Sequence, residues 1–277
     1  MNYVFFGTPK FAAIILEKLI NAEMPPVALV CNPDRPVGRK QIITPPPTKL
    51  LALEHDIAVL QPESLESDKS QITNYKPDFF VVAAYAKILP REILEIPRLG
   101  VIGVHPSLLP KFRGPSPIQS AILAGEKETG VSLFLMDERL DHGPVIAERK
   151  IAIDNLFVYS RELENRLAEM SAELLIETLP KFTRGEITPI PQDESQATYT
   201  RKFTSEDAFV SEEDLAAATS GSSPEKAIEI DRKIRALNPE PGVFTLSLSK
   251  GGPRRIKLLK AAIEGDRLVL KKIQEEG

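Results

Sequence analysis

The sequence predicts a doubly wound α/β domain followed by a smaller β-rich domain. Short apolar runs alternate with segments of helical spacing up to about residue 183, and strands that alternate with helices are typical of a doubly wound sheet. The run FFVVA at Phe79–Ala83 is apolar throughout, as expected in the middle of a parallel sheet that is covered on both faces. Residues 184–207 are polar and have no clear period. We therefore expect a domain at residues 1–183, a linker at 184–207 and a second domain at 208–277.

The chain begins with a predicted strand, turn and helix. Tyr3–Phe6 is an apolar run that ends at Gly7, and Phe11–Ile20 has apolar residues at helical spacing. Thr8 is the expected N-cap of this helix, with Pro9 at its first position. The same patterns predict further strands at Val27–Cys31, Ala58–Leu60, Phe79–Ala83, Val101–Val104, Gly130–Met136 and Val145–Ile153. They predict a loop over residues 32–47 and further helices at Thr48–Glu54, Pro117–Ala124 and Val158–Leu179.

The second domain combines one helix with short strands. Pro224–Leu237 has apolar residues at helical spacing and follows Ser223, a favourable N-cap. The short alternating runs Val243–Leu248, Arg255–Leu259 and Arg267–Lys271 predict strands separated by turns that contain glycine.

Length, composition and charge exclude several classes of protein. The 277 residues suit about two domains, and 42% hydrophobic with 27% charged residues is ordinary for a folded chain in water. The net charge of −4 argues against a surface built as a whole for nucleic acid. No apolar run approaches the roughly 20 residues that cross a bilayer, so we expect no membrane partner. Because Cys31 is the only cysteine and a strand stands in place of a signal peptide, we expect a cytoplasmic protein.

The first turn lacks the motifs that hold nucleotides or metals. Gly7 is its only glycine and G-x-G-x-x-G is absent, so a pyrophosphate has no close approach to the helix N-terminus. NAD and ATP are therefore not expected there. The chain also has no P-loop and no zinc-type spacing of Cys and His, and we expect no metal.

The stretch Gly100–Pro144 carries the residues that point to chemistry. His105 and Asp141 each follow a predicted strand, and the carboxyl ends of parallel strands are where α/β enzymes bind ligands. A carboxylate near an imidazole can fix its tautomer and favour proton transfer or oxyanion stabilisation near neutral pH. A purely structural histidine is the alternative. A metal site of His105, Asp141 and His142 is disfavoured, because adjacent side chains on an extended loop point apart.

Long motifs in a fixed order resemble a known family. GVHPSLLPKFRGPSPIQSAILAGEKETGV and then MDERLDHGP resemble the signature of the methionyl-tRNA formyltransferase family, whose members use 10-formyltetrahydrofolate. VFFGTPKFA is similar to the opening of the family, NPDRPVGRK to its inserted basic loop, and AAYAKILP to the loop after its central strand. QATYTRKFTSED and KIRALNPEPGVFT are similar to the start of its second domain and to a helix-to-strand passage within it.

The resemblance implies a fold, a reaction and a reactive centre. The fold would be a Rossmann-like domain followed by an OB-like β-barrel. The reaction would transfer a formyl group from 10-formyltetrahydrofolate to the amino group of methionine on the initiator tRNA. The reactive centre of the family holds an Asn, a His and an Asp. His105 matches the His, which would stabilise the oxyanion. Asp141 matches the Asp, which would orient His105 or a water and help remove the proton of the amine.

The resemblance also implies the binding residues and partners. The segment that would border the folate is Ser107, Leu108, Leu109 and Pro110. The loop that would line the pterin pocket with backbone groups includes Tyr85, Ala86 and Leu89. The inserted loop, which would contact the tRNA acceptor arm, includes Arg35, Arg39 and Lys40. The implied partners are 10-formyltetrahydrofolate as co-substrate and the initiator Met-tRNA, bound by a monomer without a metal.

Two positions depart from the family pattern and predict weaker catalysis. Gly103 stands where the family has Asn and supplies no side-chain amide to an oxyanion. Loss of one such donor typically costs about 2.7–4 kcal/mol, or roughly 10²–10³ in rate. A water in the vacated space would be a less preorganised donor. Ala86 stands where the family usually has glycine, and its methyl group would strain or crowd the loop if a positive φ or a close approach is needed there.

Local charge favours RNA in spite of the acidic total. Residues 31–50 carry four basic residues against one aspartate, a net charge of +3, and residues 233–260 carry seven against one glutamate, a net charge of +6. Such clusters are typical of phosphate-tracking surfaces, although a solvated face is the alternative on charge alone. The chain has one further predicted strand after Lys260, so we expect the barrel of the second domain to be reduced or incomplete.

Two other functions compete with the leading one. A formyltransferase that acts on a sugar nucleotide or another small amine would use the same folate chemistry, but it gives no reason for NPDRPVGRK together with a basic second domain. A catalytically impaired relative that binds tRNA or folate would explain Gly103.

Overall fold

The computed structural model describes residues 1–38, 40–153, 159–249 and 252–275. They form two compact units, and each is described by itself. The first unit comprises residues 1–113, 130–150 and 164–198, and the second comprises residues 114–129, 151–163 and 199–277. Both units therefore combine segments that are distant in sequence. The consecutive domains predicted at 1–183, 184–207 and 208–277 stay a prediction.

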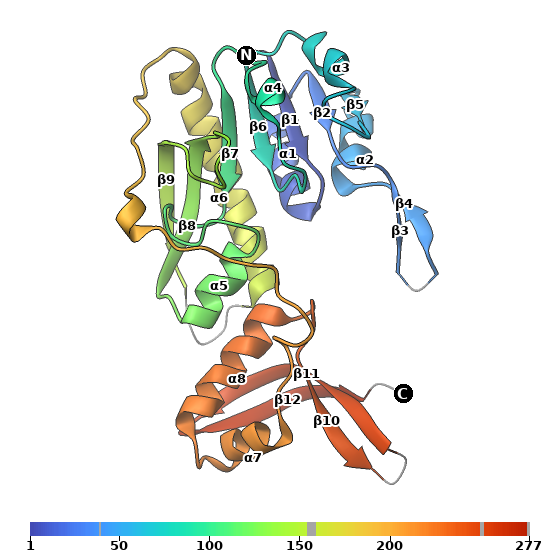
Figure 1. Ribbon diagram of the computed structural model, residues 1–277, viewed down its shortest axis with the longest axis vertical. Helices are drawn as coiled ribbons and strands as arrows, with labels where there is room; N and C mark the ends of the chain where they lie inside the picture. Colours follow the sequence, from blue (N-terminus) through green and yellow to red (C-terminus); the bar gives the residue numbers. More distant parts are fainter. Residues whose placement is uncertain (39, 154–158, 250–251, 276–277) are drawn as a thin grey trace. The chain divides into compact units, whose positions relative to one another are not determined.

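A seven-stranded sheet forms the centre of the first unit, in the order β5–β2–β1–β6–β7–β8–β9 (Figure 1). The strands are β1 Tyr3–Gly7, β2 Ala28–Val30, β5 Ala58–Leu60, β6 Phe79–Ala83, β7 Val101–His105, β8 Glu128–Leu135 and β9 Val145–Ala152. From β5 to β7, each strand pairs in parallel with the next strand in this order. The predicted α/β fold with a parallel core is confirmed.

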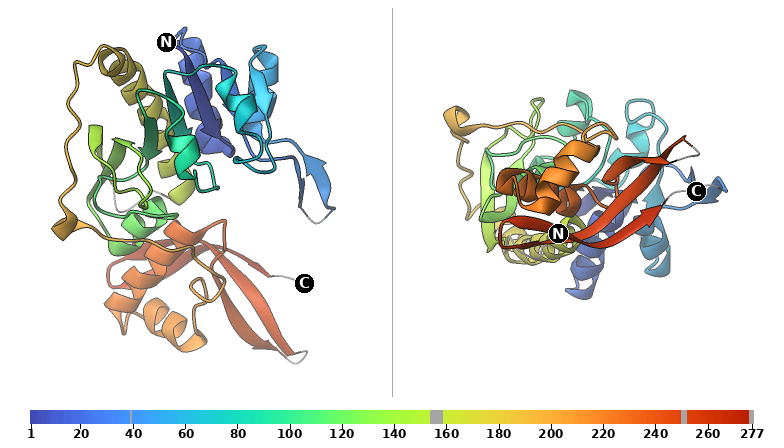
Figure 2. Two further views of the ribbon diagram at one scale, coloured as in Figure 1. Left: turned by 45° about the horizontal axis from the view of Figure 1, so that its top comes forward. Right: turned by 90° about the horizontal axis from the view of Figure 1, so that it is seen from below.

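Helices cover both faces of this sheet, as a doubly wound fold requires. α1 Lys10–Asn21 and α6 Ser160–Thr183 lie on one face, and the short α3 Lys69–Thr73 and α4 Arg91–Leu94 lie on the other (Figure 2). α2 Pro47–Glu54 lies next to α1. The sequence prediction missed α3 and α4, because helices this short do not show an apolar period. The predicted start of α6 at Val158 lies outside the described residues.

The middle of the sheet is held by aromatic contacts between neighbouring strands. Tyr3 stacks on Phe79 with ring centroids 5.1 Å apart, and Phe6 packs against Phe80 at 4.9 Å. The strand order reverses at β1, with β2 and β5 on one side and β6 and β7 on the other. In an open α/β sheet, the carboxyl ends of the strands beside such a reversal border the ligand crevice.

Two local predictions in this unit are wrong. Residues 32–47 contain the hairpin β3 Arg35–Val37 and β4 Ile42–Thr44, where a loop was expected. Thr8 does not cap α1, because Pro9 itself holds the N-cap position. The hydroxyl of Thr8 instead accepts a hydrogen bond from the backbone N–H of Asn32 at 3.1 Å. This bond joins the turn after β1 to the residues after β2.

The second unit contains a three-stranded antiparallel sheet and helices. Its strands are β10 Phe244–Ser249, β11 Gly252–Glu264 and β12 Arg267–Glu275, in that order, and its helices are α5 Pro117–Ala124, α7 Glu212–Ser220 and α8 Pro224–Leu237. Ser223 caps α8 as predicted, since its Oγ accepts from the N–H of Lys226 at 3.4 Å. A small C-terminal domain with an antiparallel sheet is thereby confirmed.

Across the part of the chain that the structure describes, none of the helices combines the length and the apolar character that a membrane crossing requires.

Candidate active site

The predicted histidine lies at the end of a buried strand, beside an antiparallel neighbour. Gly103 and His105 are two residues apart on β7, so they face the same side of the sheet. On β8 their register partners are Phe134 opposite Gly103 and Ser132 opposite His105. His105, Ser132 and Phe134 are buried. These four residues of β7 and β8 therefore lie on one face of the sheet, with His105 at the end of β7.

The imidazole of His105 has a neighbour at each nitrogen. Its Nε2 lies 2.9 Å from the carbonyl oxygen of Phe112, and its Nδ1 lies 3.7 Å from Oδ2 of Asp141. A carbonyl only accepts, so the hydrogen bond to Phe112 requires a proton on Nε2. Phe112 has φ 61, an uncommon conformation for a bulky residue, and its N–H donates to Thr198 Oγ1 at 2.8 Å. The backbone at Phe112 is therefore held in a strained form with its carbonyl at His105.

Asp141 is brought to His105 by a loop rather than by a parallel strand. The prediction that Asp141 follows the carboxyl end of a parallel strand is wrong, because β8 is antiparallel to β7. The loop of residues 136–144 returns to β8, where the N–H of Leu135 donates to the carbonyl of Pro144 at 2.9 Å. A Cβ at Gly143 would lie 1.6 Å from the carbonyl oxygen of Leu135, so only glycine permits this close return. Asp141 itself has φ 46.

The space beside Gly103 is filled by Phe134. A Cβ built on Gly103 would lie 2.4 Å from Cε1 and 2.6 Å from Cζ of the Phe134 ring, and 3.0 Å from Cγ of Met136. Apolar side chains therefore occupy the place of a Cβ at residue 103, and a water in the place of the missing amide stays a prediction. A phenyl ring supplies no N–H or O–H donor. The predicted His and Asp are near each other, and an aromatic ring lies where the Cβ of the predicted third residue would be.

The predicted folate segment after β7 is tightly bonded within the first unit. Ser107 Oγ donates to the carbonyl of Lys111 at 2.6 Å, and the N–H of Leu109 donates to Ser132 Oγ at 2.9 Å. Ser107 and Leu109 are buried, while Leu108 and Pro110 are partly exposed. These bonds fix the backbone that follows His105.

The predicted pterin loop buries two of its side chains in the core. Tyr85 and Leu89 belong to the hydrophobic core, where burial raises the pKa of Tyr85 to about 12. Ala86 is exposed and does not have a positive φ; the positive φ of this loop is at Ala84, with φ 49. The expected backbone strain at Ala86 is thus wrong. Crowding of a ligand by its methyl group stays a prediction.

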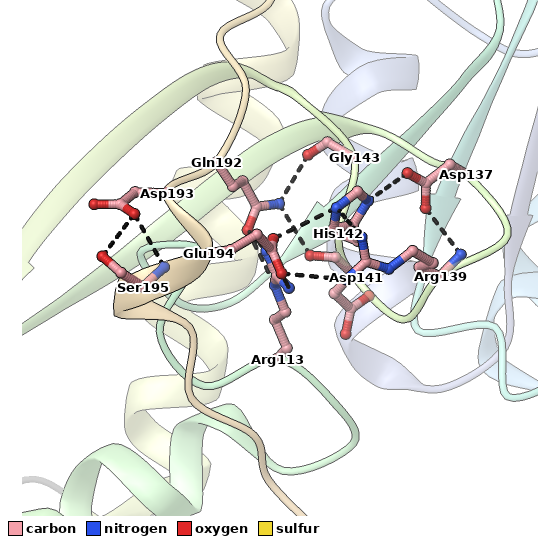
Figure 3. A network of polar contacts seen from close by, with 10 residues as sticks. All are labelled: Arg113, Asp137, Arg139, Asp141, His142, Gly143, Gln192, Asp193, Glu194 and Ser195. Atoms are coloured by element: carbon pink, nitrogen blue, oxygen red, sulfur yellow. Dashed lines mark hydrogen bonds and ion pairs between the residues drawn. The ribbon is translucent and has the colours of Figure 1, made fainter.

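A polar network behind Asp141 was not predicted from the sequence. Arg113 is fully buried and donates to Gln192 and Glu194, and Gln192 donates to the loop of Asp141 (Figure 3). Gln192 and Glu194 come from the segment that was predicted as a linker. The signal that was available is Arg113 in the motif KFRGP, because a buried guanidinium needs acceptors, and the segment PQDES supplies them.

His142 belongs to this network and has other partners than Asp141. Its Nδ1 lies 2.6 Å from Asp137 Oδ2, and its Nε2 lies 2.7 Å from Nη1 of Arg139. Arg139 only donates, so Nε2 accepts, and Nδ1 carries the proton that is donated to Asp137. The carboxylate of Asp141 lies near His105 instead. Asp141 and His142, which are neighbours in sequence, therefore contact different residues.

The residues predicted for tRNA belong to the hairpin region. Arg35 is on β3 and Lys40 precedes β4, and both are exposed. Arg39 lies outside the described residues, as does Lys250 of the second basic cluster. Arg235 was counted in that cluster, but it is buried, and its Nε donates to Asp231 at 2.7 Å. It therefore stabilises α8 internally and does not face a phosphate.

Comparisons with known proteins identify the family of this chain. The family "Formyl transferase" matches residues 1–179, and "Formyl transferase, C-terminal domain" matches residues 224–272. The protein "Methionyl-tRNA formyltransferase" of Chloroflexus aurantiacus is 42% identical over 265 residues, which are 95% of this chain and 80% of that protein. The chain belongs to the methionyl-tRNA formyltransferase family. It is accordingly a transferase.

Two solved structures share the fold of this formyltransferase chain at low sequence identity. The methionyl-tRNA formyltransferase of Clostridium thermocellum has a TM-score of 0.60 at 17% identity, and the match covers 100% of this chain and 99% of that chain. HypX of Aquifex aeolicus in complex with tetrahydrofolic acid has a TM-score of 0.64 at 21% identity, and the match covers 94% of this chain and 38% of that chain. Both likenesses agree with the predicted fold, an α/β domain followed by a small C-terminal domain.

Proposed function

We propose that this chain formylates the amino group of methionine on the initiator tRNA, with 10-formyltetrahydrofolate as the formyl donor and at a reduced rate. The observation that carries the proposal is the pair of His105 and Asp141, with Nδ1 and Oδ2 3.7 Å apart, at the positions of the family's His and Asp. We assign the reaction to residues 1–183 and RNA binding to residues 208–277 and the hairpin, in a cytoplasmic monomer.

The residues present fit a formyl donor except in one respect. The reaction needs a base for the proton of the amine, a group that orients the base, and donors for the oxygen of the tetrahedral intermediate. Asp141 provides a carboxylate and His105 an imidazole, while Gly103 and Phe134 provide no donor. In the pterin loop, the hydroxyl of Tyr85 is buried and has no hydrogen-bond partner among the described residues. The folate, when bound, supplies the formyl group on a nitrogen that acts as the leaving group.

His105 and Asp141 divide the work between proton transfer and charge stabilisation. The amine loses its proton as it attacks the formyl carbon, and the Asp141 carboxylate takes that proton directly or through one water. The carbonyl of Phe112 keeps a proton on Nε2 of His105, so Nδ1 is the nitrogen that faces Asp141. The proton that Asp141 has taken from the amine would pass to Nδ1, and the imidazolium would then place a positive charge beside the developing oxyanion. The same proton would go to the folate nitrogen as that nitrogen leaves, so no net proton is gained or lost. The protein thus acts through a preset tautomer and one nearby carboxylate.

A formylation assay tests the proposal directly. Initiator Met-tRNA and 10-formyltetrahydrofolate are incubated with the protein, and formyl-methionine is counted after hydrolysis of the ester. We expect formylation that depends on enzyme and folate, with a rate roughly 10²–10³ below that of a relative with the complete set of donors. No product above the background without enzyme would contradict the proposal.

A sugar nucleotide with an amino group is the second candidate substrate. The 42% identity to a relative named methionyl-tRNA formyltransferase favours the tRNA. The same assay with an amino sugar linked to a nucleoside diphosphate in place of Met-tRNA separates the two. Formylation of the sugar at a higher kcat/KM would move the assignment to the small amine.

The exposed cations of the hairpin give a second test of the tRNA assignment. Replacing both Arg35 and Lys40 by Ala removes two charges, so we expect weaker tRNA binding and a salt slope that is smaller by roughly two. Filter binding between about 50 and 200 mM salt measures the slope. Lys18→Ala with Lys69→Ala, on α1 and α3, is the matched control with the same change in charge. An unaltered slope in the hairpin variant would remove the hairpin from the RNA interface.

A further inference from the structure

We propose that Gln192 is a positioning residue, which rests on the buried Arg113 and holds Asp141 against His105. The inference rests on the proposed function and adds a residue from the segment between the two predicted domains. Gln192 Nε2 donates to the carbonyl of Asp141 at 3.0 Å and to the carbonyl of Gly143 at 2.8 Å. One amide thus binds the loop on both sides of His142 (Figure 3).

The orientation of the Gln192 amide is dictated by Arg113. The Nη2 and Nε atoms of Arg113 donate to Oε1 of Gln192 at 2.7 and 3.1 Å. A guanidinium has donors only, so the amide oxygen must face it and the amide nitrogen must face away. Both N–H groups of Gln192 are then presented to the two carbonyls of the loop. The chemistry of the partners therefore excludes the flipped amide.

Arg113 is a fixed support for this contact. Its side chain is fully buried, and its charge is compensated by Glu194, with Nη2 and Oε1 2.6 Å apart. Its own backbone N–H donates to the carbonyl of Thr198 at 2.9 Å. A buried, paired guanidinium has little freedom to rotate, so Gln192 takes a defined position from it.

The loop needs such support because its backbone is strained. Asp141 has φ 46, and Gly143 passes so close to Leu135 that no side chain fits. Residues in such conformations persist only where their surroundings hold them. Without Gln192, the loop loses two hydrogen bonds beside the carboxylate that faces His105. A displacement of about 1 Å at a reacting group typically lowers the rate by roughly 10²-fold.

Kinetics of Gln192→Leu test the role in positioning. We expect kcat to fall roughly 10- to 100-fold, with KM for Met-tRNA and for 10-formyltetrahydrofolate changed less than about threefold. Gln192→Glu keeps an acceptor for Arg113 and removes the donors to the loop, so it should show the same loss and covers the case that the Leu variant does not fold. Gln196→Leu is the matched control, because Gln196 is exposed on the same segment.

A double-mutant cycle shows whether Gln192 acts through Asp141. In the background of Asp141→Asn, which has lost the carboxylate, Gln192→Leu should lower kcat by less than about threefold more. Additive losses in the cycle, or a raised KM with unchanged kcat, would overturn the proposal.

A measurement without turnover separates this proposal from the proposed function. Hydrogen exchange of the backbone amides at residues 137–143 should be faster in Gln192→Leu than in the unaltered protein and unchanged in Gln196→Leu. Equal exchange in all three proteins would show that Gln192 does not hold the loop. Faster exchange in a protein that formylates no Met-tRNA would retain the role of Gln192 and contradict the proposed substrate.

Discussion

The two sides of His105 are built in opposite ways. On one side, Asp141 lies on a loop that is fixed by Gln192, and Gln192 is fixed by the buried Arg113. On the other side, Gly103 has no side chain, and the ring of Phe134 fills the space without offering a hydrogen bond. The first side holds polar contacts that would serve the proposed proton transfer, and the second holds apolar packing where the proposed donor is missing.

This difference teaches that a site can stay packed around a position that lacks the proposed catalytic side chain. Phe134 closes the gap that Gly103 leaves, so β7 and β8 remain packed and His105 stays buried. An unfilled gap would weaken the core, because a cavity costs stability in proportion to its volume. The aromatic ring therefore supports the fold where the amide would have supported the reaction.

The largest expected effect is that of His105→Ala, which removes the group common to both sides. Both the proposed stabiliser of the oxyanion and the partner of Asp141 are lost, so we expect kcat/KM for formylation to fall by roughly 10²–10⁴. The control is His55→Ala, an exposed histidine at the end of α2. Formylation of Met-tRNA by the two variants is compared at equal protein concentration. Equal rates would show that His105 takes no part in the reaction. The roles proposed for Asp141 and for the position of Gly103 would then also be wrong.

The next effect concerns the side of Gly103, where two residues must change together. Gly103→Asn alone places a Cβ within 2.6 Å of two ring atoms, so we expect a less stable protein and no gain in rate. Gly103→Asn with Phe134→Leu makes room for the amide, and we expect a gain in kcat of roughly tenfold or more over the unaltered chain. Phe134→Leu alone is the control for the removal of the ring.

Melting temperatures of the same three variants show whether the two positions share one space. If they do, the double variant should be more stable than the sum of the two single changes predicts. Additive losses of stability would mean that Phe134 does not stand in the way of residue 103. No gain in kcat from a folded double variant would show that the missing amide does not limit the rate.

The sequence predicted the parts of the molecule that depend on local pattern. The apolar run Phe79–Ala83 placed the middle of the sheet, and the capped period after Ser223 placed α8 with correct bounds. His105 and Asp141 were found by motif and are near each other in space. What the sequence did not reveal depends on contacts between distant residues. Gln192 is 51 residues from Asp141, and Phe134 is 31 residues from Gly103.

The sequence prediction missed these contacts for two reasons: it does not give the direction in which strands pair, and it does not tell which polar residues bind a buried partner. An apolar run predicts a strand but not whether it runs parallel, so the antiparallel β8 and the return of its loop were missed. The segment of Gln192 resembles a linker because its residues are polar and without period. Polar residues that satisfy a buried arginine have the same composition as residues that face water.

The smallest expected effect is a pH-dependent change in stability, caused by Glu194 on the side of Asp141. The hydrogen bond from Arg113 holds the pKa of Glu194 below its ordinary value, and the charges of Arg113 and Arg139 add to this effect. A carboxyl with a lowered folded pKa stabilises the fold above its ordinary pKa and loses that contribution as pH falls through the folded pKa. We therefore expect Glu194→Gln to lower the melting temperature at about pH 7, and the difference to shrink below about pH 4.3.

Glu186→Gln is the matched control for this last change, because Glu186 has a lowered pKa through an exposed pair with Arg184 rather than with Arg113. Both variants should show the acid-dependent loss, measured by thermal melts from about pH 3 to 7. Only Glu194→Gln should also lower kcat, since it changes a partner of Arg113. We expect the decrease to be less than about threefold, because Arg113 still donates to Gln192. An equal kcat in the two variants would mean that Gln192 positions Asp141 without help from Glu194. Glu194 would then only stabilise the buried Arg113.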